Sequence, residues 1–68
     1  MKKYRVQYRQ SDRQNDLNER ADEVYADGWR VDVASDNVVL FKHTAASDSP
    51  VFDVPRSRVT RIQEIGGG

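Results

Sequence analysis

The sequence lacks cysteine altogether and has a single histidine, His43. Without cysteine the chain forms neither a disulfide framework nor a thiolate metal site, the two devices that stabilise many very small secreted domains, and we therefore expect a cytoplasmic protein. One histidine provides no His pair for a metal ion, and a Ser/His/Asp arrangement would depend on that residue alone. These absences predict no bound metal, no cofactor and no enzymatic activity.

Glycine and long apolar runs are also scarce. Three of the four glycines stand at the C-terminal end, so Gly28 is isolated and no glycine-rich loop is present to cradle a phosphate. The longest apolar run, Val38 to Phe41, is far shorter than the roughly 20 residues that span a bilayer. Lys2 and Lys3 lead directly into alternating residues, without the apolar stretch of a signal peptide. We expect no membrane segment.

The chain has 68 residues, of which 37% are hydrophobic and 32% charged. A chain of this size buries only about 60% of its unfolded surface, so we expect one domain over residues 1–65 with one thin core. Such a core encloses no deep substrate cavity, and a sizeable pocket would need a second copy of the chain.

Positive and negative charges balance, which argues against a general binder of polyanions. The charges are segregated, however. Between Asp12 and Asp27 six acidic residues stand against two basic ones, so the remainder of the chain carries the compensating excess of bases. This acidic run does not have the spacing of a calcium loop.

Two patterns open the chain. Residues 3–9 alternate strictly, with Tyr4, Val6 and Tyr8 on one side, and this predicts a half-buried strand. Residues 12–27 predict an amphipathic helix, because Leu17, Ala21 and Val24 recur at i, i+4 and i+7.

After this helix, Gly28 is the natural C-terminal cap. Further strands are predicted at residues 29–33, 38–43, 51–54 and 59–65, the last after a tight turn near Val59. The three-residue period of Val59, Ile62 and Ile65 leaves a helix open as an alternative there, and residues 66–68 are expected to form a disordered tail. The fold class that follows is α+β, with one helix packed on a small, mainly antiparallel sheet of four to five strands in the order β-α-β-β-β-β.

Trp29 is in phase with Val31 and Val33, so we expect it to anchor the helix end to the sheet, a structural role shared with Gly28. Stacking on a base or ring is the alternative role for this side chain.

The strand at residues 38–43 is apolar at four consecutive positions, which indicates that both of its faces are covered. If Val39 and Phe41 face the helix, Val38 and Leu40 project to the opposite side. We expect that side to be covered either within the chain, by residues 44–65, or between subunits, and the candidate interface residues are Val38, Leu40 and Phe52.

Alternation also places basic side chains on the sheet face away from the helix. The candidates for gripping phosphates are Arg5, Arg9, Arg30 and Lys42, together with the later cluster Arg56, Arg58 and Arg61. The competing interpretation is that these basic side chains form a solvated or salt-bridged face. The carboxylates Asp32 and Asp53, which could act as an acid and base if they met across strands, are likewise interpreted as surface charges.

A series of short motifs runs through the first 43 residues: Tyr4, Leu17-Asn18, Ala26-Asp27-Gly28-Trp29 and Phe41-Lys42-His43. This series resembles a bacterial and phage family of short domains of unknown function, in which a strand, a helix, a Gly-Trp turn and two strands follow one another. Arg30 departs from the acidic residue common after the tryptophan, and residues 44–65 extend beyond the family's usual end. The resemblance implies a fold and not an activity.

The sequence therefore leaves two functions open. The first is a non-enzymatic, homo-oligomeric binding or adaptor module that acts through protein contacts, with a phage or mobile-element protein acting on a host factor as one form of it. The second is a nucleic-acid or nucleotide-binding module that uses the basic sheet face.

Overall fold

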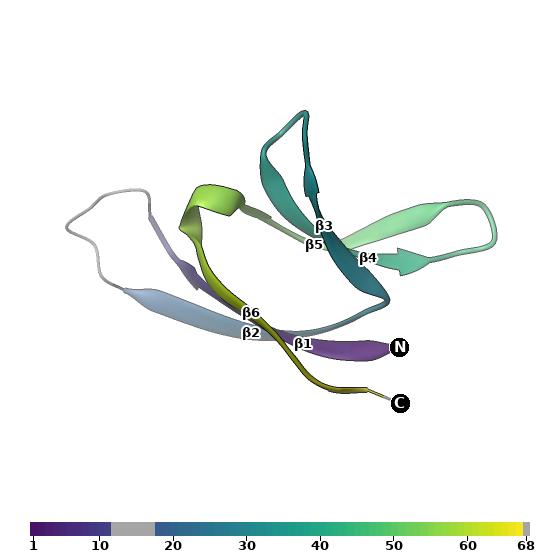
Figure 1. Ribbon diagram of the computed structural model, residues 1–68, viewed down its shortest axis with the longest axis horizontal. Helices are drawn as coiled ribbons and strands as arrows, with labels where there is room; N and C mark the ends of the chain where they lie inside the picture. The colour runs from purple at the N-terminus through teal and green to yellow at the C-terminus, as the bar shows by residue number, and fades with distance from the viewer. Residues whose placement is uncertain (12–17, 68) are drawn as a thin grey trace.

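Six β-strands and one 3₁₀ turn make up the part of the chain that the computed structural model describes, residues 1–11 and 18–67. The elements are β1 (Lys2–Arg9), β2 (Glu19–Ala26), β3 (Gly28–Asp32), β4 (Asn37–His43), β5 (Asp48–Pro55), the 3₁₀ turn η1 (Arg56–Arg58) and β6 (Val59–Gly67). They form two antiparallel three-stranded sheets (Figure 1): sheet A has the order β2-β1-β6 and sheet B the order β3-β4-β5.

The predicted α+β class is wrong, because residues 19–26 form strand β2 and not the second half of a helix. The first half of the predicted helix, residues 12–17, lies outside the described residues. β2 pairs with β1 along its whole length, from Ala26 opposite Lys2 to Glu19 opposite Arg9. In this ladder Val24 and Ala26 turn toward the core at the two-residue spacing of a strand. Cross-strand pairing thus overrides the helical spacing of the apolar residues.

The core lies between the facing sides of the two sheets. Tyr4, Val6 and Ala26 of sheet A pack against Val38, Leu40 and Val54 of sheet B, and all six are buried. Because β1 and β4 are the central strands, their alternating apolar residues carry most of this core. The predicted strands at residues 3–9 and 38–43 are confirmed, while the layer that covers them is a second sheet and not a helix.

Gly28 begins β3 instead of capping a helix. It lies opposite Phe41 of β4, and a Cβ atom at this position would come within 2.9 Å of the Phe41 ring. The absence of a side chain therefore lets the aromatic ring lie across the strand, and the contact fixes the first pair of the β3–β4 ladder.

Two turns complete the structure. In the hairpin between β3 and β4, Asp36 adopts a left-handed conformation with φ of 57°, which aspartate tolerates better than most residues. Its carboxylate accepts a 3.0 Å hydrogen bond from Arg56 Nε of η1. The tight turn predicted near Val59 is thus η1, and β6 follows it to Gly66 and Gly67, which lie opposite Lys3 and Lys2.

The two long sides of this sandwich differ. On one side β2 packs against β4 and β5, whereas the other side, between β3 and β6, is open. The radius of gyration is 12.5 Å, larger than the roughly 11 Å expected for a compact domain of this length. In the described residues, no helix has the length and apolarity needed to cross a membrane.

Candidate protein-binding groove

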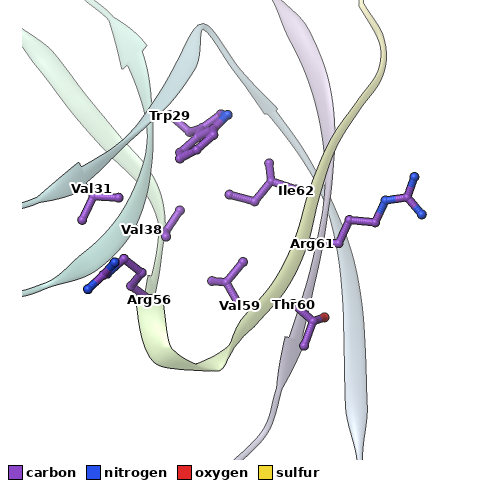
Figure 2. A pocket seen from close by; sticks show the side chains of 8 residues that line it. All are labelled: Trp29, Val31, Val38, Arg56, Val59, Thr60, Arg61 and Ile62. Atoms are coloured by element: carbon purple, nitrogen blue, oxygen red, sulfur yellow. The ribbon is translucent and has the colours of Figure 1, made fainter.

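A groove of about 400 Å³ occupies the open side of the sandwich (Figure 2). Its lining residues come from β3, β4, η1 and β6: Trp29, Val31, Val38, Arg56, Val59, Thr60, Arg61 and Ile62. The indole of Trp29 and the side chain of Ile62 point toward one another across the groove, while the guanidinium of Arg61 points away from it. The groove is therefore apolar inside and has basic residues at its margin.

The β6 wall of the groove depends on a β-bulge. Gln7 lies opposite Arg61 but Tyr8 lies opposite Val59, so Thr60 is the extra residue. Its hydroxyl donates a 3.1 Å hydrogen bond to the carbonyl oxygen of Gln7. The bulge turns Val59 and Ile62 to the same face although they are three residues apart. The three-residue period in this part of the sequence, which also fits a helix, thus arises from a bulged strand.

The β3 wall consists of an apolar stripe along one side of an edge strand. Trp29 and Val31 are 46% and 39% exposed, and Val33, the first residue of the following turn, is 95% exposed. Single exposed apolar residues are ordinary, but here Trp29 and Val31 lie at alternate positions of β3 and Val33 follows the strand directly in the turn, so the exposed apolar residues are grouped. We call Trp29, Val31 and Val33 the β3 stripe.

The outer edge of β3 has no strand partner among the described residues, since β3 pairs only with β4. Natural edge strands are commonly protected against further pairing by lysine, proline or a bulge. β3 carries Arg30 and Asp32 on its outer face but has no lysine, proline or inward-pointing charge, and its ladder with β4 is regular. Its backbone groups and its stripe are consequently both accessible to an added strand.

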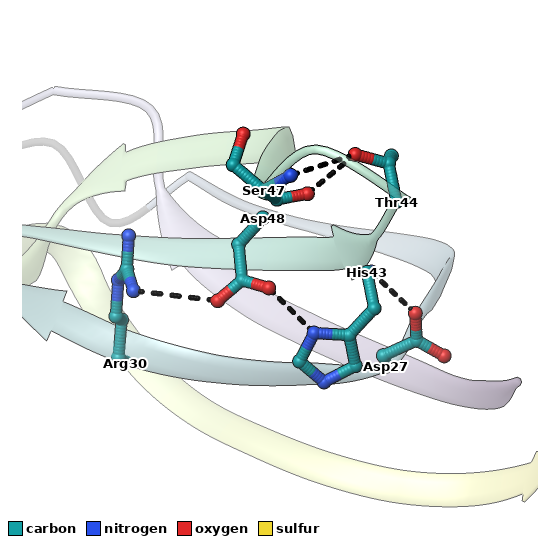
Figure 3. Close-up of polar contacts among 6 residues, drawn as sticks. All are labelled: Asp27, Arg30, His43, Thr44, Ser47 and Asp48. Carbon is teal, nitrogen blue, oxygen red and sulfur yellow. Dashed lines mark hydrogen bonds and ion pairs between the residues drawn. The ribbon is translucent and has the colours of Figure 1, made fainter.

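The opposite face of β3 is held by a polar cluster on the outside of sheet B (Figure 3). Arg30 Nη1 lies 3.8 Å from one carboxylate oxygen of Asp48, and His43 Nδ1 lies 2.5 Å from the other. The guanidinium carbon of Arg30 is also 5.4 Å from the centre of the Phe41 ring. These contacts join all three strands of sheet B, so the cluster supports β3 from behind.

The corner between the sheets is fixed by Asp27, the single residue between β2 and β3. Its carboxylate accepts a 2.6 Å hydrogen bond from the backbone N–H of His43, and its own N–H donates to the carbonyl of Phe41 at 2.8 Å. The position of β3 relative to β2 is therefore set by two hydrogen bonds to β4.

The predicted basic face is divided in the structure. Arg5 and Arg9 lie on the outside of sheet A, whereas Arg30 lies on the outside of sheet B and Lys42 near the end of β4 on its inner side. Several of these bases have acidic partners: Arg5 pairs with Glu23, Arg30 with Asp48 and Arg56 with Asp36. Arg58 lies in η1 beside Arg56, and Arg61 lies on β6. The structure does not bring the seven candidates together.

The predicted interface residues lie inside the chain. Val38 and Leu40 are buried against sheet A, and Phe52 is half-buried with its ring 5.9 Å from that of Tyr8. Residues 44–65 thus help to cover the second face of β4 within one copy. The exposed apolar surface is instead the β3 stripe, which the sequence pattern had placed under a helix.

The electrostatic contacts on sheet A contribute to the stability of the sheet and are not part of the groove. Lys3 Nζ lies 3.0 Å and Arg5 Nη2 3.3 Å from Glu23, and the hydrogen bond from Lys3 is the main cause that lowers the pKa of the Glu23 carboxyl and raises that of Lys3. The Tyr8 hydroxyl donates a 2.6 Å hydrogen bond to Asp22, which raises the pKa of the phenol. Within the described ranges, no three histidine or acidic side chains meet to hold a metal ion.

Comparison with protein-family models, curated proteins and solved structures gave no match. The resemblance of residues 1–43 to short bacterial and phage domains therefore stays a prediction. The groove and the chemistry of its two walls are the features of the structure that bear on function.

Proposed function

We propose that this chain is a non-enzymatic protein-binding module that takes up an extended, apolar segment in the groove between β3 and β6. The observation that supports this most is the β3 stripe, whose Trp29 and Val31 remain accessible beside an unpaired strand edge. An extended segment added to such an edge gains backbone hydrogen bonds, and its alternate side chains enter the groove.

The lining of the groove suits this mode of binding. Tryptophan is among the residues that contribute most to protein interfaces, because it removes a large apolar area from water at small cost in side-chain entropy. Trp29 faces Ile62 across the groove, and arginine side chains stand at its margin. A partner with alternating apolar residues and an acidic flank is the best complement. We further propose that this binding takes place in the cytoplasm, where a chain without cysteine has no need of an oxidising compartment.

Trp29 is the only tryptophan, so its fluorescence reports directly on the groove. We expect peptides selected from a library of extended, apolar-alternating sequences to shift its emission to shorter wavelength in a saturable manner. Ile62→Glu places a charge in the groove and should weaken binding about tenfold or more. Ile65→Glu is the matched control, because Ile65 lies on the same strand, is exposed and does not line the groove.

Thermal unfolding of both variants separates lost binding from lost folding. If Ile62→Glu does not fold, Val31→Glu tests the opposite wall at a more exposed position. Emission that no selected peptide changes, or equal loss of affinity in Ile62→Glu and Ile65→Glu, contradicts the proposal.

A further inference from the structure

We infer that the segment paired with the edge of β3 is β3 of a second copy of this chain, antiparallel and related by a two-fold axis through Val31. The inference rests on the proposed function and specifies its partner. β3 combines three features: an unpaired edge, an apolar stripe on one face and charges on the other.

The sequence of β3 is self-complementary about Val31. With Val31 opposite its own counterpart, Arg30 lies opposite Asp32 of the second copy, and Asp32 opposite Arg30 of the second copy. On the other face Val31 lies opposite its own counterpart, and Val33, the first residue of the turn after β3, follows in line with Trp29 of the second copy. Residues directly opposite one another share a face of the sheet, so this pairing matches charge with opposite charge and apolar with apolar.

Neighbouring registers lose this match. A slip of one residue places the stripe of one copy opposite the charged face of the other. The nearest slips that keep the faces aligned place either Arg30 opposite Arg30 or Asp32 opposite Asp32, and like charges directly opposite one another destabilise a sheet. The register centred on Val31 is therefore preferred over its neighbours on electrostatic grounds.

Both charged residues retain capacity for a new partner. Arg30 contacts Asp48 at 3.8 Å through one nitrogen, and its side chain is 60% exposed. Asp32 accepts hydrogen bonds from the Ser35 hydroxyl at 2.9 Å and the Ala34 N–H at 3.3 Å, which leaves acceptor sites on both oxygens. The apolar residues of the added strand would extend the inner face of sheet B beside the groove and remove the β3 stripe from water.

The absence of cysteine from the chain allows a direct test of the register. Opposed residues of an antiparallel pair have Cα atoms about 4.5–5.5 Å apart, within the roughly 4.4–6.8 Å that a disulfide bridges. Val31→Cys should therefore oxidise to a covalent dimer. Val33→Cys is the matched control, since its counterpart lies four residues along the strand, about 13 Å away.

We expect Val31→Cys to form the disulfide dimer about tenfold faster than Val33→Cys. Simple accessibility predicts the reverse, because Val33 is far more exposed than Val31. Equal rates, or faster oxidation of Val33→Cys, overturn the register.

Charge reversal provides a second measurement on the unlinked chain. Arg30→Asp and Asp32→Arg should each raise the dimer dissociation constant about tenfold, because each pair occurs twice in a two-fold dimer. Arg30→Asp/Asp32→Arg should restore it. If a single reversal fails to fold, the cysteine pair still decides the register.

Sedimentation of the unsubstituted chain separates this inference from the proposed function. A strict monomer whose Trp29 emission responds to peptides overturns the inference and leaves the proposed function standing. A strict monomer with no response overturns both. A dimer indifferent to every β3 variant places the interface elsewhere and also overturns the inference.

Discussion

β2 and β3 are consecutive edge strands, separated by one residue, and they differ in almost every respect that governs contact with other molecules. β2 carries four charged residues in eight, and its side of the sandwich packs against β4 and β5. β3 presents Trp29 and Val31 beside an open groove. The charges of β2 lie on both of its faces and protect that edge from further pairing, whereas those of β3, Arg30 and Asp32, are confined to one face and leave the other apolar. The binding that we propose for this small molecule therefore depends on one edge and not on its overall composition.

Both edge strands rest on one core, and Leu40→Ala is the variant expected to disturb that core most. Leu40 is fully buried between the sheets, and removing such a side chain costs about 2–5 kcal/mol. For a domain of this size that is a large share of the total stability, so we expect loss of cooperative unfolding in denaturant. Val51→Ala, at an exposed position of β5, should change the unfolding free energy by less than about 0.5 kcal/mol. Similar losses in both variants would show that the sheets do not share this core.

A lysine introduced into each edge strand in turn tests whether the two edges differ in their tendency to pair. Val31→Lys places an edge-protecting residue on β3, and we expect the dimer dissociation constant to rise about tenfold or more. Tyr25→Lys makes the same kind of change at an exposed position of β2 and should leave self-association unchanged. Sedimentation equilibrium on both variants measures the difference, and an equal effect at the two positions removes the distinction between the strands.

A smaller effect is expected where β3 begins. Gly28→Ala brings a methyl group against the Phe41 ring, and the ring must move, at a cost of about 1 kcal/mol. Phe41→Leu removes that clash, so the alanine should cost less in its presence than alone. A double-mutant cycle in denaturant measures this coupling, and strictly additive effects would mean that the ring does not constrain residue 28.

The smallest effect concerns the charges of sheet A. Because Lys3 and Arg5 lower the pKa of Glu23 below its ordinary value of 4.5, the carboxylate contributes stability that is present above this value and is lost as the pH falls through the lower pKa of the folded state. Glu23→Gln should therefore flatten the decline in melting temperature below about pH 4.5. Glu19→Gln, at an exposed position of the same strand, is the control, and an identical acid profile for both variants contradicts the assignment.

The sequence predicted a strand correctly where the apolar pattern within the strand itself indicates it. Alternation over residues 3–9 and the apolar run in residues 38–43 predicted β1 and β4 correctly. β2 was missed because Ala21 and Val24 also satisfy a helical spacing, and the ladder that decides between the two structures is formed with β1, from Arg9 opposite Glu19 to Lys2 opposite Ala26. The four charged residues of β2 fit an exposed edge strand as well as they fit a helix surface.

The position of the exposed apolar residues was predicted wrongly for the same reason. Val38 and Leu40 were correctly read as needing cover, but sheet A provides it within one chain. Trp29 was expected under a helix, and with no helix there it lines an open groove. One signal for the groove was already present, since the three-residue spacing of Val59 and Ile62 marks the bulge that turns both inward. Single-sequence reasoning does not distinguish that bulge from a helical turn.

The pairing of β1 with β6 brings the first and last strands together, and this allows the strand order along the chain to be changed. Lys2 lies opposite Gly67, so the first and last strands are neighbours and a short linker between them closes the backbone into a ring. New ends opened between Ala45 and Ala46, in the exposed loop between β4 and β5, then leave every strand pair intact. In the natural order β1 and β6 are the two strands farthest apart in sequence, whereas in the permuted chain the linker makes them consecutive. Such a circular permutant should reach the same fold by a different route, because pairing β1 with β6 then closes a short loop while pairing β4 with β5 closes the longest one.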